Sequence, residues 1–249
     1  MTTKVEIRNH ATKNEIYCIH IIHHPRDMDD NCESGSGSSN KHLHHFVLVH
    51  GAGHGGWCWY KVRRLLEASG HNVTCLDLKC SGIDPTDFNT VFSFDDYNQP
   101  LTTFMSSLSP NHKARGLDAF EFIYGLRLNQ PPTGVMVKPE LRRQVLYNAS
   151  PVEDFILASM LLRPSPARAL PSVNVVRNDS LENIVVLRVF IIKTMKDKLF
   201  KPERQENMIK QWPPSKVFAI DESDHSPFFS TPDMLFPLLL EAAISIKMP

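Results

Sequence analysis

The chain has 249 residues, 42% of them hydrophobic, which fits one globular domain. Its 27 basic and 27 acidic residues balance, so neither nucleic acid nor an anionic membrane is an expected partner. No apolar run reaches membrane-spanning length, and the first residues lack the apolar core of a signal peptide. Five cysteines without a C-x-x-C pair indicate reduced thiols and a cytoplasmic protein.

Residues 1–44 predict a flexible amino-terminal extension. Within it, residues 27–40 are polar and rich in Gly and Ser, and they bury too little apolar surface to offset the entropy cost of ordering. Before this linker, residues 15–22 could form an isolated strand. The histidines around these segments are irregularly spaced, so the sequence predicts no metal site, and nothing in it indicates a cofactor.

Residues 45–249 show alternating strand and helix patterns, which predict a mostly parallel sheet flanked by helices. One helix is expected to begin at Ser150, with Ser150 as cap, Pro151 in the first position and Glu153 completing a capping box. The predicted strands are 45–49, 72–78, 185–193 and 217–220, and the other predicted helices are 57–69, 93–108 and one starting at Thr231.

A glycine-rich segment, His50 to Trp57 (HGAGHGGW), directly follows the first of these strands. Such a loop is typical of the oxyanion hole of a serine hydrolase of the α/β-hydrolase type, because glycines permit a sharp turn and a backbone amide can face developing negative charge. These enzymes carry their nucleophile on a strand-to-helix elbow with the pattern G-x-S-x-G. That pattern is absent from the chain.

Two further residues have positions suited to hydrolase chemistry. Asp197 follows the strand 185–193 and His225 follows the strand 217–220. The carboxyl ends of parallel strands are where α/β sheets place their sites, and acid before histidine is the chain order of α/β hydrolases. His225 would accept the proton of a nucleophile, and Asp197 would orient the imidazole.

Several segments together resemble the plant methylesterase family, the esterase branch that shares its fold with plant hydroxynitrile lyases. They are HGAGHGGWCWYKV, GHNVTCLDLKCSGIDP, LYNASPVEDFILASMLLRPSP, DKLFKPE and DESDHSPF. The resemblance covers most of residues 45–249 and implies an α/β-hydrolase fold with a small helical lid at about 114–175. It also implies hydrolysis of methyl esters of small plant signals: salicylate, jasmonate and indole-3-acetate.

The resemblance assigns roles to individual residues. Ala52 corresponds to an oxyanion-hole amide, Asp197 to the triad acid and His225 to the triad base, while Ser81 lies in a pocket loop without an assigned chemical role. The related lyases carry Thr and Lys where this chain has Gly51 and Ser226. Without that lysine no positive charge would hold cyanide, so the resemblance favours ester hydrolysis.

The expected nucleophile strand, its elbow, the following helix and the next strand are missing near residues 113–120, which predicts a truncated fold. Asp118 lies at nearly the expected distance along the chain from His50, but no apolar strand precedes it. Cys80 and Ser81 are alternative nucleophiles, although neither lies on an elbow.

Three hypotheses follow. The favoured one is a methylesterase relative without useful catalysis. The second is an esterase with a nonstandard nucleophile: Asp118, Ser81 or Cys80. The third is a binder of small apolar carboxylates or esters; its predicted lid residues are Phe120, Phe122, Leu126, Leu161 and Leu162. The oligomeric state stays open, with a homodimer among the possibilities.

Overall fold

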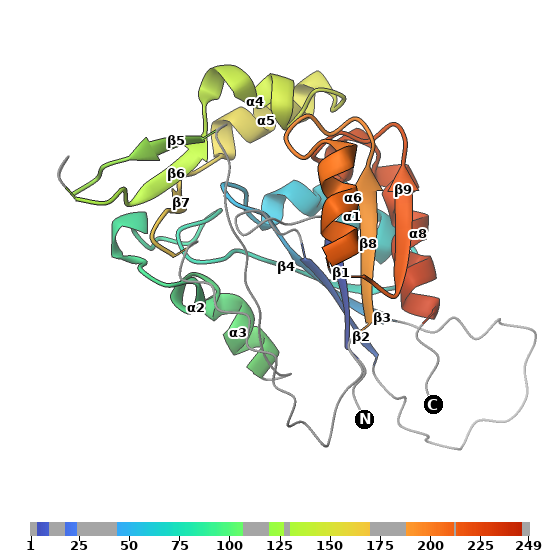
Figure 1. The fold of residues 1–249 in the computed structure, drawn as a ribbon. Coiled ribbons are helices and arrows are strands. Elements are labelled where there is room, and N and C mark those ends of the chain that lie inside the picture. Colours follow the sequence, from blue (N-terminus) through green and yellow to red (C-terminus); the bar gives the residue numbers. More distant parts are fainter. Residues whose placement is uncertain are drawn as a thin grey trace, which may run out of the picture.

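A computed structural model describes residues 4–9, 18–23, 44–106, 120–126, 130–169, 188–211 and 213–245. Within these ranges the main sheet has six strands in the order β4-β3-β2-β1-β8-β9 (Figure 1). No helix in the same ranges is long and apolar enough to cross a membrane. The strands are β1 Lys4–Asn9, β2 Cys18–His23, β3 His44–Val49, β4 Asn72–Leu76, β8 Arg188–Thr194 and β9 Lys216–Ile220.

The strand directions agree with the predicted mostly parallel sheet. β3 pairs in parallel with β4, and β8 pairs in parallel with both β1 and β9. Only β2 among these strands runs the other way, antiparallel to β1 and to β3. The carboxyl ends of β3, β8 and β9 therefore lie at the same edge of the sheet, which is the edge where α/β sheets place their sites.

The amino-terminal residues depart from the prediction. Residues 1–44 were expected to be a flexible extension, but β1 and β2 form two neighbouring strands inside the main sheet. The expected isolated strand at 15–22 is instead a paired strand at Cys18–His23. Alternating apolar and polar residues in a short segment were too weak a signal to predict this, because the pairing partners lie far away in the chain. The predicted linker, residues 27–40, lies outside the described residues.

Helices cover the sheet on both faces. Phe46 and Leu48 pack on one face into a core with α1 (Tyr60–Ala68) and α8 (Pro232–Ile244). The alternate residues Val47 and Val49 pack on the opposite face in a second cluster that includes Leu101 of α3. Burial on both faces explains why β3 reads as a continuous apolar run. The opposite face also carries α6 (Pro202–Gln211), which packs against β8 (Figure 1).

Several predicted helices are divided in the structure. The predicted helix 93–108 forms two, α2 (Phe94–Tyr97) and α3 (Gln99–Ser106), and Pro100 lies in the first turn of α3, where its missing N–H costs least. The predicted helix 57–69 is a 3-10 turn, Gly56–Trp59, followed by α1. The short helix α7 (Pro227–Ser230) precedes α8. Another 3-10 turn, Phe88–Thr90, precedes α2.

The predicted lid contains a sheet as well as helices. Its three antiparallel strands are β5 (Phe120–Ile123), β6 (Gly134–Val137) and β7 (Ser165–Pro166). Its helices are α4 (Pro139–Val145) and α5 (Val152–Leu161), which Figure 1 shows beyond the carboxyl edge of the main sheet. The two helices agree with the predicted small helical lid, and the three-stranded sheet is an addition that the sequence did not predict.

Candidate active site

Asp197 and His225 come together as the sequence predicted. His225 Nδ1 lies 3.0 Å from Asp197 Oδ2, and both side chains are buried. Asp197 follows β8 and His225 follows β9, so the parallel pairing of these strands brings the two loops side by side. Since a carboxylate accepts, Nδ1–H donates to Asp197, and in this tautomer of the neutral ring the lone pair that can accept a proton is on Nε2.

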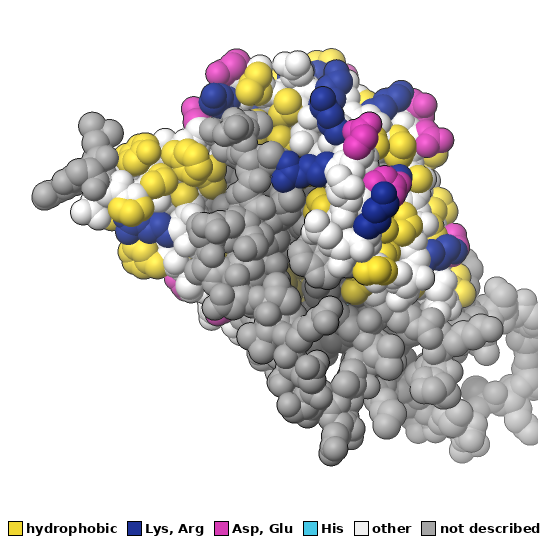
Figure 2. All heavy atoms as spheres, viewed as in Figure 1, with side chains coloured by type: hydrophobic (Ala, Val, Ile, Leu, Met, Phe, Trp, Pro, Cys, Tyr) yellow, Lys and Arg dark blue, Asp and Glu magenta, His cyan; other side chains and the backbone are white. Residues whose placement is uncertain are grey.

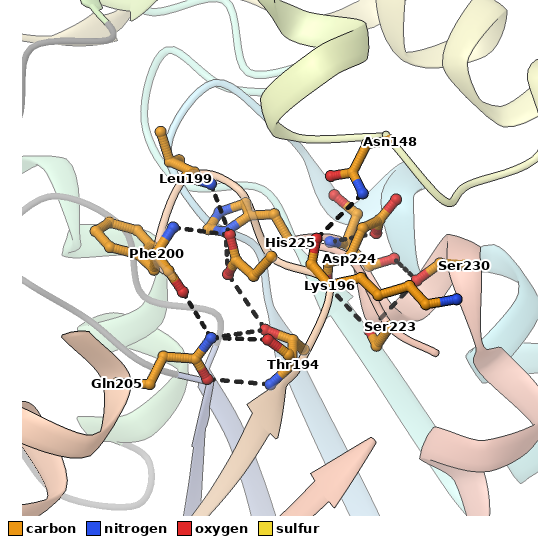
Figure 3. A network of polar contacts seen from close by, with 12 residues as sticks. Asn148, Thr194, Lys196, Leu199, Phe200, Gln205, Ser223, Asp224, His225 and Ser230 are labelled. Carbon is orange, nitrogen blue, oxygen red and sulfur yellow. Dashed lines mark hydrogen bonds and ion pairs between the residues drawn. The ribbon is translucent and has the colours of Figure 1, made fainter. Parts of the chain in front are cut away.

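Both oxygens of the Asp197 carboxylate accept hydrogen bonds, and Figure 3 labels four of the residues that donate them: Thr194, Leu199, Phe200 and His225. Its Oδ1 accepts from the amides of Leu199 at 2.9 Å and Phe200 at 2.7 Å, and its Oδ2 also accepts from Thr194 Oγ1 at 3.2 Å. Behind this turn, the buried amide of Gln205 on α6 accepts from Thr194 N and donates to Thr194 O and Phe200 O. These contacts fix the orientation of the acid from two sides.

A second buried carboxylate holds the loop of His225 to the lid. Asp224 Oδ2 accepts from Ala149 N at 2.8 Å, Ser150 N at 2.7 Å and Ser150 Oγ at 2.9 Å, while Oδ1 accepts from Ser226 N at 2.9 Å. The predicted capping box at Ser150 is therefore wrong: α5 begins at Val152, with no side-chain cap, and the Ser150 hydroxyl donates to Asp224.

The glycine-rich loop has the features of an oxyanion hole. The Ala52 amide donates no hydrogen bond to any residue in the described ranges. The next peptide unit is held on both sides: the Ala52 carbonyl lies 3.1 Å from His54 Nδ1, and Gly53 N donates to Ser165 Oγ at 2.6 Å. A fixed peptide with an adjacent free amide is the arrangement that stabilises negative charge on an oxygen.

His54 connects this loop to the lid. Its Nδ1 donates to the Ala52 carbonyl, so its Nε2 accepts from Tyr147 Oη at 2.6 Å. Burial lowers the pKa of His54 to about 3, against a smaller opposing effect of the Ala52 carbonyl. Burial also lowers the pKa of His50, whose Nε2 accepts from Leu78 N at 3.0 Å. Both imidazoles are therefore neutral at pH 7 and serve as hydrogen-bonding groups.

Comparisons with known proteins give the family. A family model described as "Alpha/beta hydrolase family" matches residues 46–113. The pheophorbidase of Raphanus sativus is 40% identical over 263 residues, which cover 86% of this chain and 99% of that protein. Methylesterase 17 of Arabidopsis thaliana is 38% identical over 256 residues, covering 81% and 92%. The crystal structure of the methylesterase MES16 from Arabidopsis aligns with a TM-score of 0.70 at 36% identity, covering 81% and 99%.

The chain belongs to the plant methylesterase family. Its fold is the α/β-hydrolase fold, as the sequence motifs predicted. Its relatives in this family are carboxylic ester hydrolases.

The alignment with pheophorbidase also contains many positions that this chain does not fill. It has 263 positions but includes only 86% of the 249 residues here, about 214, which leaves about 50 positions without a residue of this chain. The match to the family model ends at residue 113, at the start of the region where the nucleophile segment is predicted to be missing. The place of the deletion along the chain stays a prediction.

Two of the predicted substitute nucleophiles are hydrogen-bonded or buried in the structure. Ser81 Oγ donates to Lys79 O at 3.4 Å and lies 3.3 Å from Tyr97 Oη, so the hydroxyl already has two partners. Cys80 is buried in the cluster around Val47 and Val49, and burial raises the pKa of its thiol to about 12. Asp118 lies outside the described residues.

The predicted ligand-binding residues of the lid do not form a buried group. Phe122 is 56% exposed, Leu126 51% and Leu161 37%, whereas Leu162 packs against the main core. Figure 2 shows hydrophobic side chains gathered at the surface of the lid sheet. The side chain of Phe120 lies outside the described part of the structure. Of this set, Leu162 alone contacts the interior through a described side chain.

Sequence reasoning missed Gln205, Asp224, His54 and Tyr147. The sequence DESDH offered two aspartates near His225, but only burial distinguishes Asp224 from the exposed Asp221. His54 stood in the quoted motif HGAGHGGW, but its contact with Tyr147, 93 residues away, had no signal in the sequence. No three His, Cys, Asp or Glu side chains of the described part are grouped to hold a metal ion.

Proposed function

We propose that this methylesterase-family protein binds small carboxylic esters or acids without hydrolysing them through an acyl-enzyme. The observation that carries the proposal is a buried Asp197–His225 pair in a chain that lacks G-x-S-x-G. In triad hydrolases, loss of the nucleophile leaves only about 10³–10⁴-fold acceleration over water. One oxyanion amide belongs to the residue after the nucleophile, so less than that is expected here.

The groups that remain suit a carboxylate or ester oxygen. The unpaired Ala52 amide can donate to such an oxygen, and His225 can donate once protonated. Ser226 follows His225, and its buried hydroxyl has no partner among the described residues. It gives the site no fixed positive charge, in contrast to the lysine that the resemblance assigns to the lyases. Salicylate, jasmonate and indole-3-acetate, with their methyl esters, are therefore the first ligands to test.

The names of two relatives add further compounds to the ligands to be tested. Pheophorbidase and the pFDCC methylesterase MES16 of Arabidopsis thaliana are named for two other compounds, pheophorbide and pFDCC. The ligands of this chain are proposed to come from the combined set of these compounds and the plant signals.

The test compares the full chain with His225→Ala and with Asp221→Asn, an exposed control in the same loop. Hydrolysis of p-nitrophenyl acetate and methyl salicylate should not exceed that of His225→Ala. Calorimetry should show binding of at least one acid or ester, weakened about tenfold or more in His225→Ala and unchanged in Asp221→Asn, since one lost charged hydrogen bond costs about 1.5–3 kcal/mol.

Two results would overturn the proposal. Absence of binding across the whole panel would remove the binding function. Hydrolysis that His225→Ala abolishes would establish an active esterase with a replacement nucleophile. In that case Asp118→Asn, Ser81→Ala and Cys80→Ala, made singly, would identify the nucleophile by which variant loses activity.

A further inference from the structure

The two halves of the site stand on two different strand pairs. β3 and β4 carry the oxyanion loop that starts at His50, whereas β8 and β9 carry Asp197 and His225. In the described sheet the two pairs do not touch each other. β2 pairs with β3, β1 pairs with β8, and β1 pairs with β2, so the β1–β2 hairpin joins the halves.

The hairpin occupies the position that the missing segment leaves open. The missing segment is predicted to contain a strand, the elbow, a helix and a second strand, and the alignment with pheophorbidase has about 50 positions without a residue of this chain. Neighbouring strands lie about 4.8 Å apart, so loss of two strands would leave β3 and β8 about 10 Å too far apart to pair. Two strands of any direction fill that width.

The residues of the hairpin suit this position on one face. The register sets Ile21 opposite Phe46 and Ile19 opposite Leu48. On the other side it sets Ile7 opposite Phe190. Phe46, Leu48 and Phe190 belong to the core beneath α1 and α8, and α8 also packs against β1. Opposite residues of paired strands share a face, so the register sets apolar positions of the hairpin beside strand positions that belong to this core.

The sequence of β1 alternates between polar and apolar residues. Lys4, Glu6 and Arg8 alternate with Val5 and Ile7. A central strand of a parallel sheet is ordinarily apolar on both faces because helices cover both, whereas alternation is typical of a strand with one solvated face. The helix that follows the nucleophile is part of the missing segment. An amphipathic strand therefore matches a sheet that has lost one covering helix.

We propose that the β1–β2 hairpin replaces the two missing central strands of the methylesterase sheet and so positions the oxyanion loop relative to the Asp197–His225 pair. The proposal concerns the scaffold and holds whether or not the site binds the ligands proposed above. The hairpin acts through the strands it pairs with and contributes no group to the reaction.

A native cysteine provides a direct test. Cys18 stands opposite Val49 across the β2–β3 ladder. Opposite Cα atoms of antiparallel strands are about 4.5–5.5 Å apart, which lies within the range of a disulfide. Oxidation of Val49→Cys should link residues 18 and 49, identified by mass spectrometry of the digested protein. A second pair, Ile19→Cys with Leu48→Cys in a Cys18→Ser background, covers the alternate spacing of the ladder.

Val47→Cys is the matched control for this cross-link. It is the same substitution two residues along β3, opposite His20, and so about 7–8 Å or more from Cys18 by Cα distance. It should not link to Cys18. Absence of both register cross-links in folded protein, or equal linkage of Cys18 to positions 47 and 49, would overturn the proposal.

Deletion of residues 1–23 tests the positioning role. In the deletion variant, amides of β3 and β8 should exchange with solvent at least about 100-fold faster, and the imidazole signals of His225 should shift. A synthetic peptide of residues 1–23 should restore both, as strand addition does at other sheet edges, and a scrambled peptide should not. Wild-type exchange and wild-type His225 signals in the deletion variant would refute the role.

If the deletion variant does not fold, hydrogen exchange in the full chain still tests the proposal. In the full chain, amides of Lys4–Asn9 and Cys18–His23 should be protected from exchange to an extent similar to those of β3. Exchange at the rate of an unfolded peptide in these two segments would overturn the proposal without any substitution.

Discussion

Replacement of Asp224 by Asn tests the contact between the lid and the loop of His225. The carboxylate is completely buried and accepts four hydrogen bonds, three at Oδ2 and one at Oδ1. An Asn side chain can keep its oxygen toward Ala149 and Ser150, and its NH₂ group then faces the Ser226 amide. The cheaper orientation thus loses one bond and sets the Ser226 N–H against the new NH₂ group, so that donors on both sides of this contact are left unpaired.

The expected destabilisation follows from that count. An unpaired buried donor costs about 1–3 kcal/mol, and the remaining bonds lose their charge-assisted strength. We expect Asp224→Asn to lower the free energy of unfolding by about 2–3 kcal/mol. Asp224→Ala removes all four acceptor contacts and should cost about 4 kcal/mol or more, a large share of the total for a domain.

Urea unfolding measures both variants beside Asp221→Asn, which changes an exposed residue of the same loop and should cost less than about 0.5 kcal/mol. At about 2 kcal/mol per molar urea, Asp224→Asn should move the midpoint down by about 1 M. In Asp224→Asn, hydrogen exchange should rise at the Ser226 amide, whose bond is lost, and in Asp224→Ala it should rise at Ala149 and Ser150 as well. A midpoint equal to that of Asp221→Asn, or unchanged exchange at Ala149 and Ser150 in Asp224→Ala, would refute the assigned contact.

Three further predictions concern buried titratable groups. The pKa of His54 is about 3 in the folded protein and lies below its ordinary value of 6.5, so its contribution to stability is present above pH 6.5 and lost as pH falls toward 3; pH-dependent unfolding should show a loss of up to about 1.4 kcal/mol per pH unit, which His54→Gln reduces. Tyr147→Phe leaves His54 Nε2 without its donor and should cost about 1–3 kcal/mol in urea unfolding, whereas an unchanged midpoint would exclude the contact as a stabilising one. Burial raises the pKa of the Cys58 thiol, that of Cys75 to about 11 and that of Cys80 to about 12, so iodoacetamide should label all three slowly at pH 8 in folded protein and rapidly in urea; fast labelling of Cys80 in the folded state would contradict its buried position.

Local patterns in the sequence were sufficient for part of the site. The apolar run before His50 and the glycines after it predicted the strand and its loop, and the strands before Asp197 and His225 predicted that these two residues meet. The reason is that the carboxyl ends of parallel strands lie at one edge of the sheet, so residues that directly follow neighbouring strands lie close together. The catalytic roles of these residues remain predictions.

Contacts across the chain were beyond the reach of local patterns. Asp224 bonds to Ser150, which is 74 residues away, and that partner rather than a helix end determines the role of the Ser150 hydroxyl. The strands β1 and β2 likewise follow from pairing with β3 and β8. A short alternating segment has a similar sequence pattern whether it lies alone or within a sheet. Only the pairing with β3 and β8 shows that these segments lie within the sheet.

The Asp197–His225 pair does not depend on a nucleophile for its own stability. Besides His225, the carboxylate accepts from two backbone amides and from Thr194, and these donors come from the turn that contains it. Breaking a buried pair by removing one partner is expensive, whereas removing a nucleophile beyond His225 leaves the pair and all of these bonds in place. The pair can thus persist in a chain that has lost hydrolysis, and its geometry alone does not distinguish a binder from an esterase. Measuring hydrolysis and binding in the full chain and in His225→Ala makes that distinction. With a working nucleophile, hydrolysis and binding would both decrease in His225→Ala. Without a nucleophile, the full chain would show binding but no hydrolysis.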